Sequence, residues 1–121
     1  MARLLVIDDD IDLATLTVIR LKKAGHEVTA VHDGVAGLAA IRDLRPELVV
    51  LDWMMPGMDG IEVAVAVRAD ESIAETPLVM VTAKSAADDL DRAIEAGVDA
   101  VLSKPYLPAD LVARIATILA A

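Results

Sequence analysis

The chain has 121 residues, 56% of them hydrophobic, and a formal net charge of -9. This length fits one domain with its own core over 1–121, and the excess of carboxylates argues against direct binding of nucleic acid or an anionic membrane. Cys is absent, which excludes disulfides, and neither a membrane-spanning run nor a secretory cleavage pattern is found, so we expect a soluble protein of the cytoplasm.

Short apolar runs alternate with longer amphipathic stretches along the whole chain. In chain order the pattern predicts a strand at 4–7, a helix at about 11–24, a strand at 28–31, a helix opening at 33–34 and ending before 46, a strand at 48–51, a helix from about 59, a strand at 78–81, a helix from about 85 to 97, a strand at 98–102 and a helix from about 108. Five such strand–helix repeats with short connections predict an α/β fold, a parallel sheet between two layers of helices.

Helix ends and buried faces follow from local signals. Asp59 with Glu62 resembles a capping box, and Ser85 with Asp88 predicts a similar cap for the fourth helix. Glycines at 25 and 97 are typical helix stops. The positions expected to face the core are Ile11, Ala14, Val18 and Leu21, then Ile61, Ala64 and Val65, then Leu90, Ala93 and Ile94, and finally Leu111, Ile115 and Ile118.

Polar side chains follow four of the five predicted strands. They are Asp8, Asp9 and Asp10 after the first strand, Asp52 after the third, Thr82 after the fourth and Lys104 after the fifth. Ligands of open parallel sheets bind at the carboxyl ends of the strands, so these groups are expected to meet there. Converging carboxylates repel one another, and a hard cation such as Mg²⁺ relieves that repulsion. A carboxylate can also accept a phosphoryl group, while a hydroxyl and an ammonium neutralise its charge.

Four segments carry a resemblance to a known family. They are Leu5-Val6-Ile7-Asp8-Asp9-Asp10, Leu51-Asp52-Trp53-Met54-Met55-Pro56-Gly57-Met58-Asp59-Gly60, Thr82-Ala83 and Lys104-Pro105. In this order and spacing they resemble the receiver domains of two-component response regulators, over essentially the whole chain. The resemblance implies a doubly wound, CheY-like sheet with strand order 2-1-3-4-5, and a cis peptide bond before Pro105. An effector domain, if the protein has one, is expected outside these residues.

The resemblance also implies a role for each matching residue. Asp52 matches the phosphoacceptor, and Thr82 and Lys104 match the hydroxyl and the ammonium that bind the phosphoryl group. Asp9 matches the direct ligand of Mg²⁺, Asp8 its acidic neighbour, and the backbone carbonyl of Met54 a further ligand, with Asp52 completing the metal site. The partners implied are a sensor histidine kinase or histidine phosphotransfer protein and a downstream effector domain or protein. A dimer that forms on phosphorylation is allowed by the same resemblance.

One position departs from the family pattern. Many receivers carry Tyr or Phe three residues before the lysine, where this chain has Val101, and Tyr106 does not replace that ring. We therefore expect the Thr82 part of the switch to be kept and the aromatic part to be absent or altered. Trp53 is expected to be partly exposed near the site.

Other functions fit the residues less well. Asp8, Asp10 and Asp12 have the spacing of a calcium-binding loop, but Leu13 and Ile19 stand where that loop needs Gly and Glu. Asp10 and Asp12 are therefore interpreted as residues that cap the first helix and place negative charge in its first turn. A phosphatase of the haloacid-dehalogenase type would need a second Asp two residues after Asp52, where this chain has Met54. A flavodoxin-like protein would need a phosphate-binding loop after the first strand, where this chain has Asp8-Asp9-Asp10. A receiver that acts only as an interaction module would not need its acidic pocket.

Overall fold

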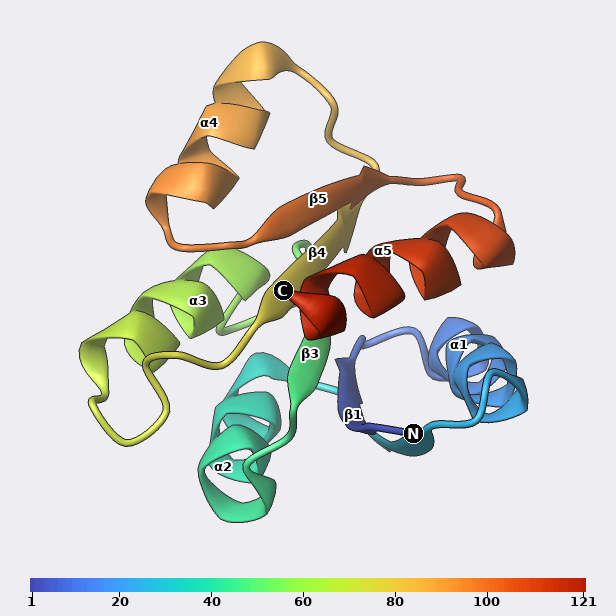
Figure 1. The fold of residues 1–121 in the computed structure, drawn as a ribbon. Helices are drawn as coiled ribbons and strands as arrows, with labels where there is room; N and C mark the ends of the chain where they lie inside the picture. Colours follow the sequence, from blue (N-terminus) through green and yellow to red (C-terminus); the bar gives the residue numbers. More distant parts are fainter.

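The structure, a computed structural model, describes residues 1–121 as a parallel sheet between two helical layers (Figure 1). The elements in chain order are β1 (Arg3–Ile7), α1 (Ile11–Lys23), β2 (Glu27–Val31), α2 (Gly34–Leu44), β3 (Leu48–Asp52), α3 (Gly60–Ala69), β4 (Leu78–Thr82), α4 (Ala87–Glu95), β5 (Ala100–Ser103) and α5 (Pro108–Ala120). All five predicted strand–helix repeats are present. No helix combines the length and the hydrophobicity that crossing a bilayer requires.

The five strands lie in the order β2-β1-β3-β4-β5 and are all parallel, as predicted. The register pairs Ile7 of β1 with Leu51 of β3, and Asp52 of β3 with Val81 of β4. The carboxyl ends of the three central strands therefore lie at one edge of the sheet. The peptide bond Lys104-Pro105 is cis, as the resemblance implied.

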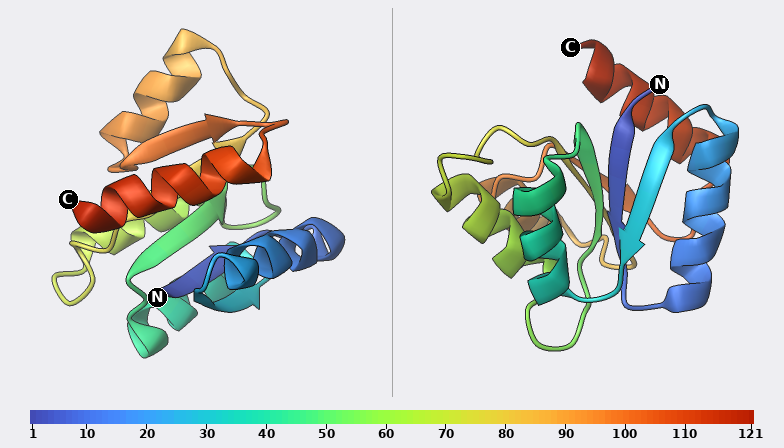
Figure 2. Two further views of the ribbon diagram at one scale, coloured as in Figure 1. Left: turned by 45° about the vertical axis from the view of Figure 1, so that its right-hand side comes forward. Right: turned by 90° about the horizontal axis from the view of Figure 1, so that it is seen from below.

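Helices cover both faces of the sheet, and each face has its own core. Alternate strand residues such as Val6 and Val50 pack against Leu21 of α1 and Ile115 of α5 on one face. Their neighbours in the strands pack against α2 and α3 on the other face, where the central side chains are Ile7, Leu51, Ile41, Val63 and Val67. Figure 2 shows α1 and α5 on one side of the sheet and α2 and α3 on the other. Burial on both faces explains why the three central strands, β1, β3 and β4, are apolar along most of their length.

Several predicted core positions are wrong because they lie outside the face that meets the sheet. Ile11 is 60% exposed, since it is the first residue of α1. Val65 is 52% exposed, because α3 buries the face that contains Val63, Ala64 and Val67. In α4 only Ala93 is buried, and the predicted partners Leu90 and Ile94 are exposed.

Two predicted boundaries are also corrected. The Asp59–Glu62 capping box forms as expected, but the proposed Ser85 cap does not, because the N-cap residue of α4 is Ala86 and no side chain caps the helix. Strand β5 begins at Ala100 rather than at Val98. The amide of Val98 donates to the carbonyl of Ala93, so this residue belongs to the turn that ends α4.

Candidate functional site

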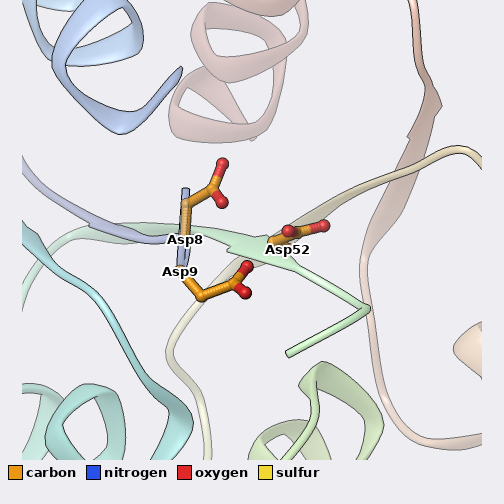
Figure 3. Close-up of side chains that lie close together, drawn as sticks. All are labelled: Asp8, Asp9 and Asp52. Atoms are coloured by element: carbon orange, nitrogen blue, oxygen red, sulfur yellow. The ribbon is translucent and has the colours of Figure 1, made fainter. Parts of the chain in front are cut away.

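Three carboxylates meet at the carboxyl edge of the sheet. Asp8 and Asp9 follow the last residue of β1, and Asp52 is the last residue of the neighbouring strand β3. One oxygen from each of these side chains lies within 4.8 Å of the others (Figure 3). We call these three residues the carboxylate cluster. The structure thus brings together the three acidic side chains that the sequence singled out as metal ligands.

Two members of the carboxylate cluster are buried, and burial changes their chemistry. Asp8 is 4% and Asp52 is 6% exposed, whereas Asp9 is exposed. The pKa of Asp8 is raised to about 6, mainly by burial and also by the charge of Asp52, while a hydrogen bond from the Asp10 amide and the charge of Lys104 oppose the shift. The fold therefore holds a carboxyl group that is costly to ionise in the absence of a cation.

The ammonium of Lys104 lies next to the carboxylate cluster. Its Nζ is 3.3 Å from Oδ1 of Asp52, in a pair whose side chains are 25% and 8% exposed. The backbone also fixes this lysine, because its amide donates to the carbonyl of Thr82 at 2.7 Å. This hydrogen bond joins the carboxyl ends of β4 and β5 beside Asp52.

Thr82 ends β4, one residue beyond Val81, which is the register partner of Asp52. Its side chain is 1% exposed, and its Oγ1 accepts a hydrogen bond from the amide of Lys84 at 3.0 Å. The hydroxyl therefore lies at the same edge of the sheet as the carboxylate cluster. Its role toward a phosphoryl group remains a prediction, as does the role of the Met54 carbonyl in the loop after β3.

The loop between β3 and α3 is held against Asp52 by a close contact. The amide of Gly60 donates to the carbonyl of Trp53 at 2.8 Å. A Cβ atom on Gly60 would collide with the carbonyl oxygen of Asp52 and lie 2.8 Å from Cα of Trp53. Only glycine fits this first position of α3 without moving the strand end that carries Asp52.

Sequence reasoning missed the surroundings of Trp53. The side chain is 2% exposed, so the prediction of partial exposure is wrong. Lys84 and Arg92 lie over the ring, with Nζ 5.2 Å and Cζ 5.4 Å from its centroid. No local signal could have found these contacts, because the two cations lie more than one element away in the sequence.

Asp10 and the histidines take structural positions. Asp10 caps α1 by accepting a hydrogen bond from the amide of Leu13 at 3.0 Å, as predicted. Nδ1 of His26 accepts from the amide of Ala2, and Nδ1 of His32 contacts the carbonyl of Asp8, so the two rings that flank β2 bond the backbone that flanks β1.

The donor set of the carboxylate cluster fits a hard divalent cation. All three ligand atoms are carboxylate oxygens, with no His or Cys among them, which favours Mg²⁺ or Ca²⁺ over softer metals. Opposite ligands of Mg²⁺ lie about 4.2 Å apart, at twice its bond length of about 2.1 Å. The oxygens of the carboxylate cluster lie within 4.8 Å of one another, so small rotations of the side chains would bring all three to this spacing. The residues present fit magnesium.

Lowering the pH is expected to stabilise the protein when no divalent cation is present. Because the pKa of Asp8 is about 6 in the fold against 3.8 in an unstructured chain, the folded state binds more protons than the unfolded state in this window. The free energy of unfolding should then rise by about 1 kcal/mol between about pH 7 and pH 5.

Urea unfolding in EDTA at these two pH values measures the effect. Asp8→Asn is the control, since it removes the titrating group and keeps the shape of the side chain. A pH trend that is the same in the wild-type protein and in Asp8→Asn would show that Asp8 is not the source.

Comparison with known proteins gives a consistent result. Residues 4–116 match the family model described as "Response regulator receiver domain". The chain is 44% identical over 113 residues to the DNA-binding response regulator MtrA of Mycobacterium tuberculosis, covering 93% of this chain and 48% of that protein. It is 35% identical over 116 residues to the phosphate regulon transcriptional regulatory protein PhoB of Pseudomonas aeruginosa, covering 96% of this chain and 51% of PhoB. The chain thus spans about half the length of these curated relatives.

A solved structure matches the fold as well as the sequence. The chemotaxis protein CheY4 of Vibrio cholerae superposes with a TM-score of 0.92 at 30% identity, covering 98% of both chains.

Proposed function

The chain belongs to the response regulator receiver domain family of two-component systems, and from this we propose that residues 1–121 form one phosphoacceptor domain in which Asp52 accepts a phosphoryl group in a Mg²⁺-dependent reaction. One observation carries the proposal. Oδ1 of Asp52 lies 3.3 Å from Nζ of Lys104, and one carboxylate oxygen of Asp52 lies within 4.8 Å of an oxygen of Asp8 and an oxygen of Asp9. A nucleophile, a fixed cation and a set of metal ligands therefore meet at one point.

The reaction that this geometry supports is the transfer of a phosphoryl group from a histidine nitrogen to a carboxylate oxygen of Asp52. A carboxylate oxygen of Asp52 attacks the phosphorus of a phosphohistidine, a P–O bond forms, and the P–N bond breaks, leaving its electron pair on the imidazole nitrogen. The product is a mixed anhydride on Asp52. Water then attacks the phosphorus and forms a P–O bond, while the P–O bond to Asp52 breaks and leaves its electron pair on the carboxylate. Inorganic phosphate leaves with the protons of the water.

The side chains around Asp52 match the demands of this transfer. Bound by Asp8, Asp9, Asp52 and the Met54 carbonyl, Mg²⁺ would supply positive charge to the phosphoryl oxygens. Lys104 holds a second positive charge at Asp52. In this proposal Thr82 turns its hydroxyl to donate to the phosphoryl group, and the movement is the signal.

The expected phosphodonor is a sensor histidine kinase or a histidine phosphotransfer protein. A mainly apolar groove, lined by Leu13 and Leu16 of α1 and by Pro105 and Leu111 near α5, reaches Lys104. A donor helix resting in this groove would hold its phosphohistidine beside Asp52.

The output is expected to pass to an effector domain or protein. MtrA is named as a DNA-binding response regulator and PhoB as a transcriptional regulatory protein. We therefore propose that nucleic acid is contacted by the effector and not by this acidic domain. A cytoplasmic location and a dimer that forms on phosphorylation belong to the same proposal.

Acetyl phosphate with and without Mg²⁺ tests the proposed function. Intact mass should show the gain of one phosphoryl group only when Mg²⁺ is present, and the adduct should be lost at alkaline pH, as acyl phosphates are. Trp53 fluorescence should report Mg²⁺ binding in the same titration. A protein that binds Mg²⁺ but gains no mass would be an interaction-only receiver, and continuous turnover of organophosphates would indicate a phosphatase.

A further inference from the structure

Trp53 joins the phosphoacceptor strand to two other segments of the chain. It follows Asp52, and its buried ring lies 5.2 Å from Nζ of Lys84 in the loop before α4 and 5.4 Å from Cζ of Arg92 in α4. Both distances are within the roughly 6 Å at which a cation is attracted to the face of an aromatic ring. We call this arrangement of Trp53, Lys84 and Arg92 the indole contact.

The position of Arg92 is not explained by the charges of its own helix. It is the only basic residue of α4, which also contains Asp88, Asp89, Asp91 and Glu95. Carboxylates three or four positions away are the usual ion-pair partners of an arginine on a helix. However, none of the ion pairs in the structure involves Arg92. Its guanidinium lies over the indole of Trp53 instead.

Helix α4 has few other attachments to the molecule. Ala93 is its only buried residue, and no side chain caps its N-terminus. Leu90 and Ile94 are 37% and 56% exposed. In Figure 1 the helix stands beside the edge strand β5, at the margin of the layer formed by α2 and α3. The contact between Arg92 and Trp53 therefore has a large influence on where α4 lies.

Lys84 connects the indole contact to the hydroxyl of Thr82. The amide of Lys84 donates to Thr82 Oγ1 at 3.0 Å, and the Lys84 ammonium is 3.9 Å from a carboxylate oxygen of Asp89 in α4. If the hydroxyl turned toward a phosphoryl group on Asp52, its bond to this amide would change. The position of the Lys84 ammonium relative to Trp53 and α4 would change with it.

We propose that Trp53 is a positioning residue that couples the phosphorylation state of Asp52 to the position of α4, through Lys84 and Arg92. The inference rests on the proposed function. Trp53 and Tyr106 are the only aromatic residues of the chain, and β5 carries Val101 at its second position. Trp53 is the ring that lies between the site and α4.

Arg92→Gln tests the indole contact in the unmodified protein. The variant removes one positive charge from an exposed position of α4, and Arg114→Gln makes the same change at an exposed position of α5. Loss of a cation–π contact at an exposed site raises the equilibrium constant for local opening of the backbone by about two- to fivefold. Hydrogen exchange of the amides of α4 should accelerate by this factor in Arg92→Gln and not in Arg114→Gln. Equal exchange in both variants would overturn the proposal.

Beryllofluoride with Mg²⁺, a mimic of the phosphoryl group, tests the coupling itself. All variants should bind one equivalent, because Arg92 does not touch Asp52. The change in the hydrogen exchange of α4 on binding should be at least about twofold smaller in Arg92→Gln than in the wild-type protein, which is the effect expected from loss of the cation–π contact. Arg92→Lys keeps the positive charge and should restore the wild-type change. An unchanged α4 response in Arg92→Gln would overturn the coupling. Failure of the wild-type protein to bind beryllofluoride would reject the proposed function and the coupling with it, while the exchange of the unmodified variants would still report on the contact.

Discussion

Asp52→Asn is expected to abolish the phosphoryl adduct completely. The amide of asparagine is neutral and a poor nucleophile, so no anhydride can form at this position. The substitution also removes one of the three carboxylates that lie within 4.8 Å of one another, which should weaken Mg²⁺ binding by about tenfold or more. Intact mass after incubation with acetyl phosphate and Mg²⁺ measures the first effect, and a Mg²⁺ titration of Trp53 fluorescence measures the second.

Asp12→Asn is the matched control for this experiment. It makes the same change of charge in the first turn of α1, where Asp12 is exposed. We expect this variant to gain one phosphoryl group as the wild-type protein does. An adduct of the same yield in Asp52→Asn would mean that another side chain accepts the phosphoryl group, and the assignment of Asp52 would have to be abandoned.

Arg68→Ala is expected to destabilise the fold by about 3 kcal/mol, the largest stability effect that we predict. The guanidinium of Arg68 in α3 donates to the carbonyls of Ala74, Thr76 and Gly97 at 2.7–3.0 Å. It also donates to Asp99, whose carboxylate accepts from the amide of Leu78 at the start of β4. Removing the guanidinium leaves partly buried carbonyls without a donor, at the end of the sheet opposite the carboxylate cluster.

Arg42→Ala separates this network effect from the simple loss of a charge. Arg42 pairs with Asp70 at 2.9 Å, but its side chain is 51% exposed, so the expected destabilisation is much smaller than that of Arg68→Ala. The pKa of Asp70 is lowered first by a hydrogen bond from Ser72 and then by the one from Arg42, so the carboxylate keeps a partner when the arginine is lost. Urea unfolding of both variants provides the comparison. Equal destabilisation would show that the carbonyl contacts of Arg68 contribute little.

The fold could be predicted because its signals are local. The buried strands β3 and β4 each contain four apolar residues in succession. Helix ends carry caps such as Asp10 and Asp59, each of which bonds an amide three residues away. The predictions that were wrong depend on the position of an element relative to the sheet. Val65 has the hydrophobicity of a core residue, yet α3 meets the sheet with its other face.

The order of the elements and the polar residues at the carboxyl ends of the strands follow from the amino-acid sequence alone, because both depend on residues that are neighbours in the chain. The raised pKa of Asp8, the burial of Trp53 under Lys84 and Arg92, and the carbonyl contacts of Arg68 arise only when the chain is folded. Burial and electrostatic attraction depend on distance in space, and the groups that meet at these places come from separate strands, helices and loops.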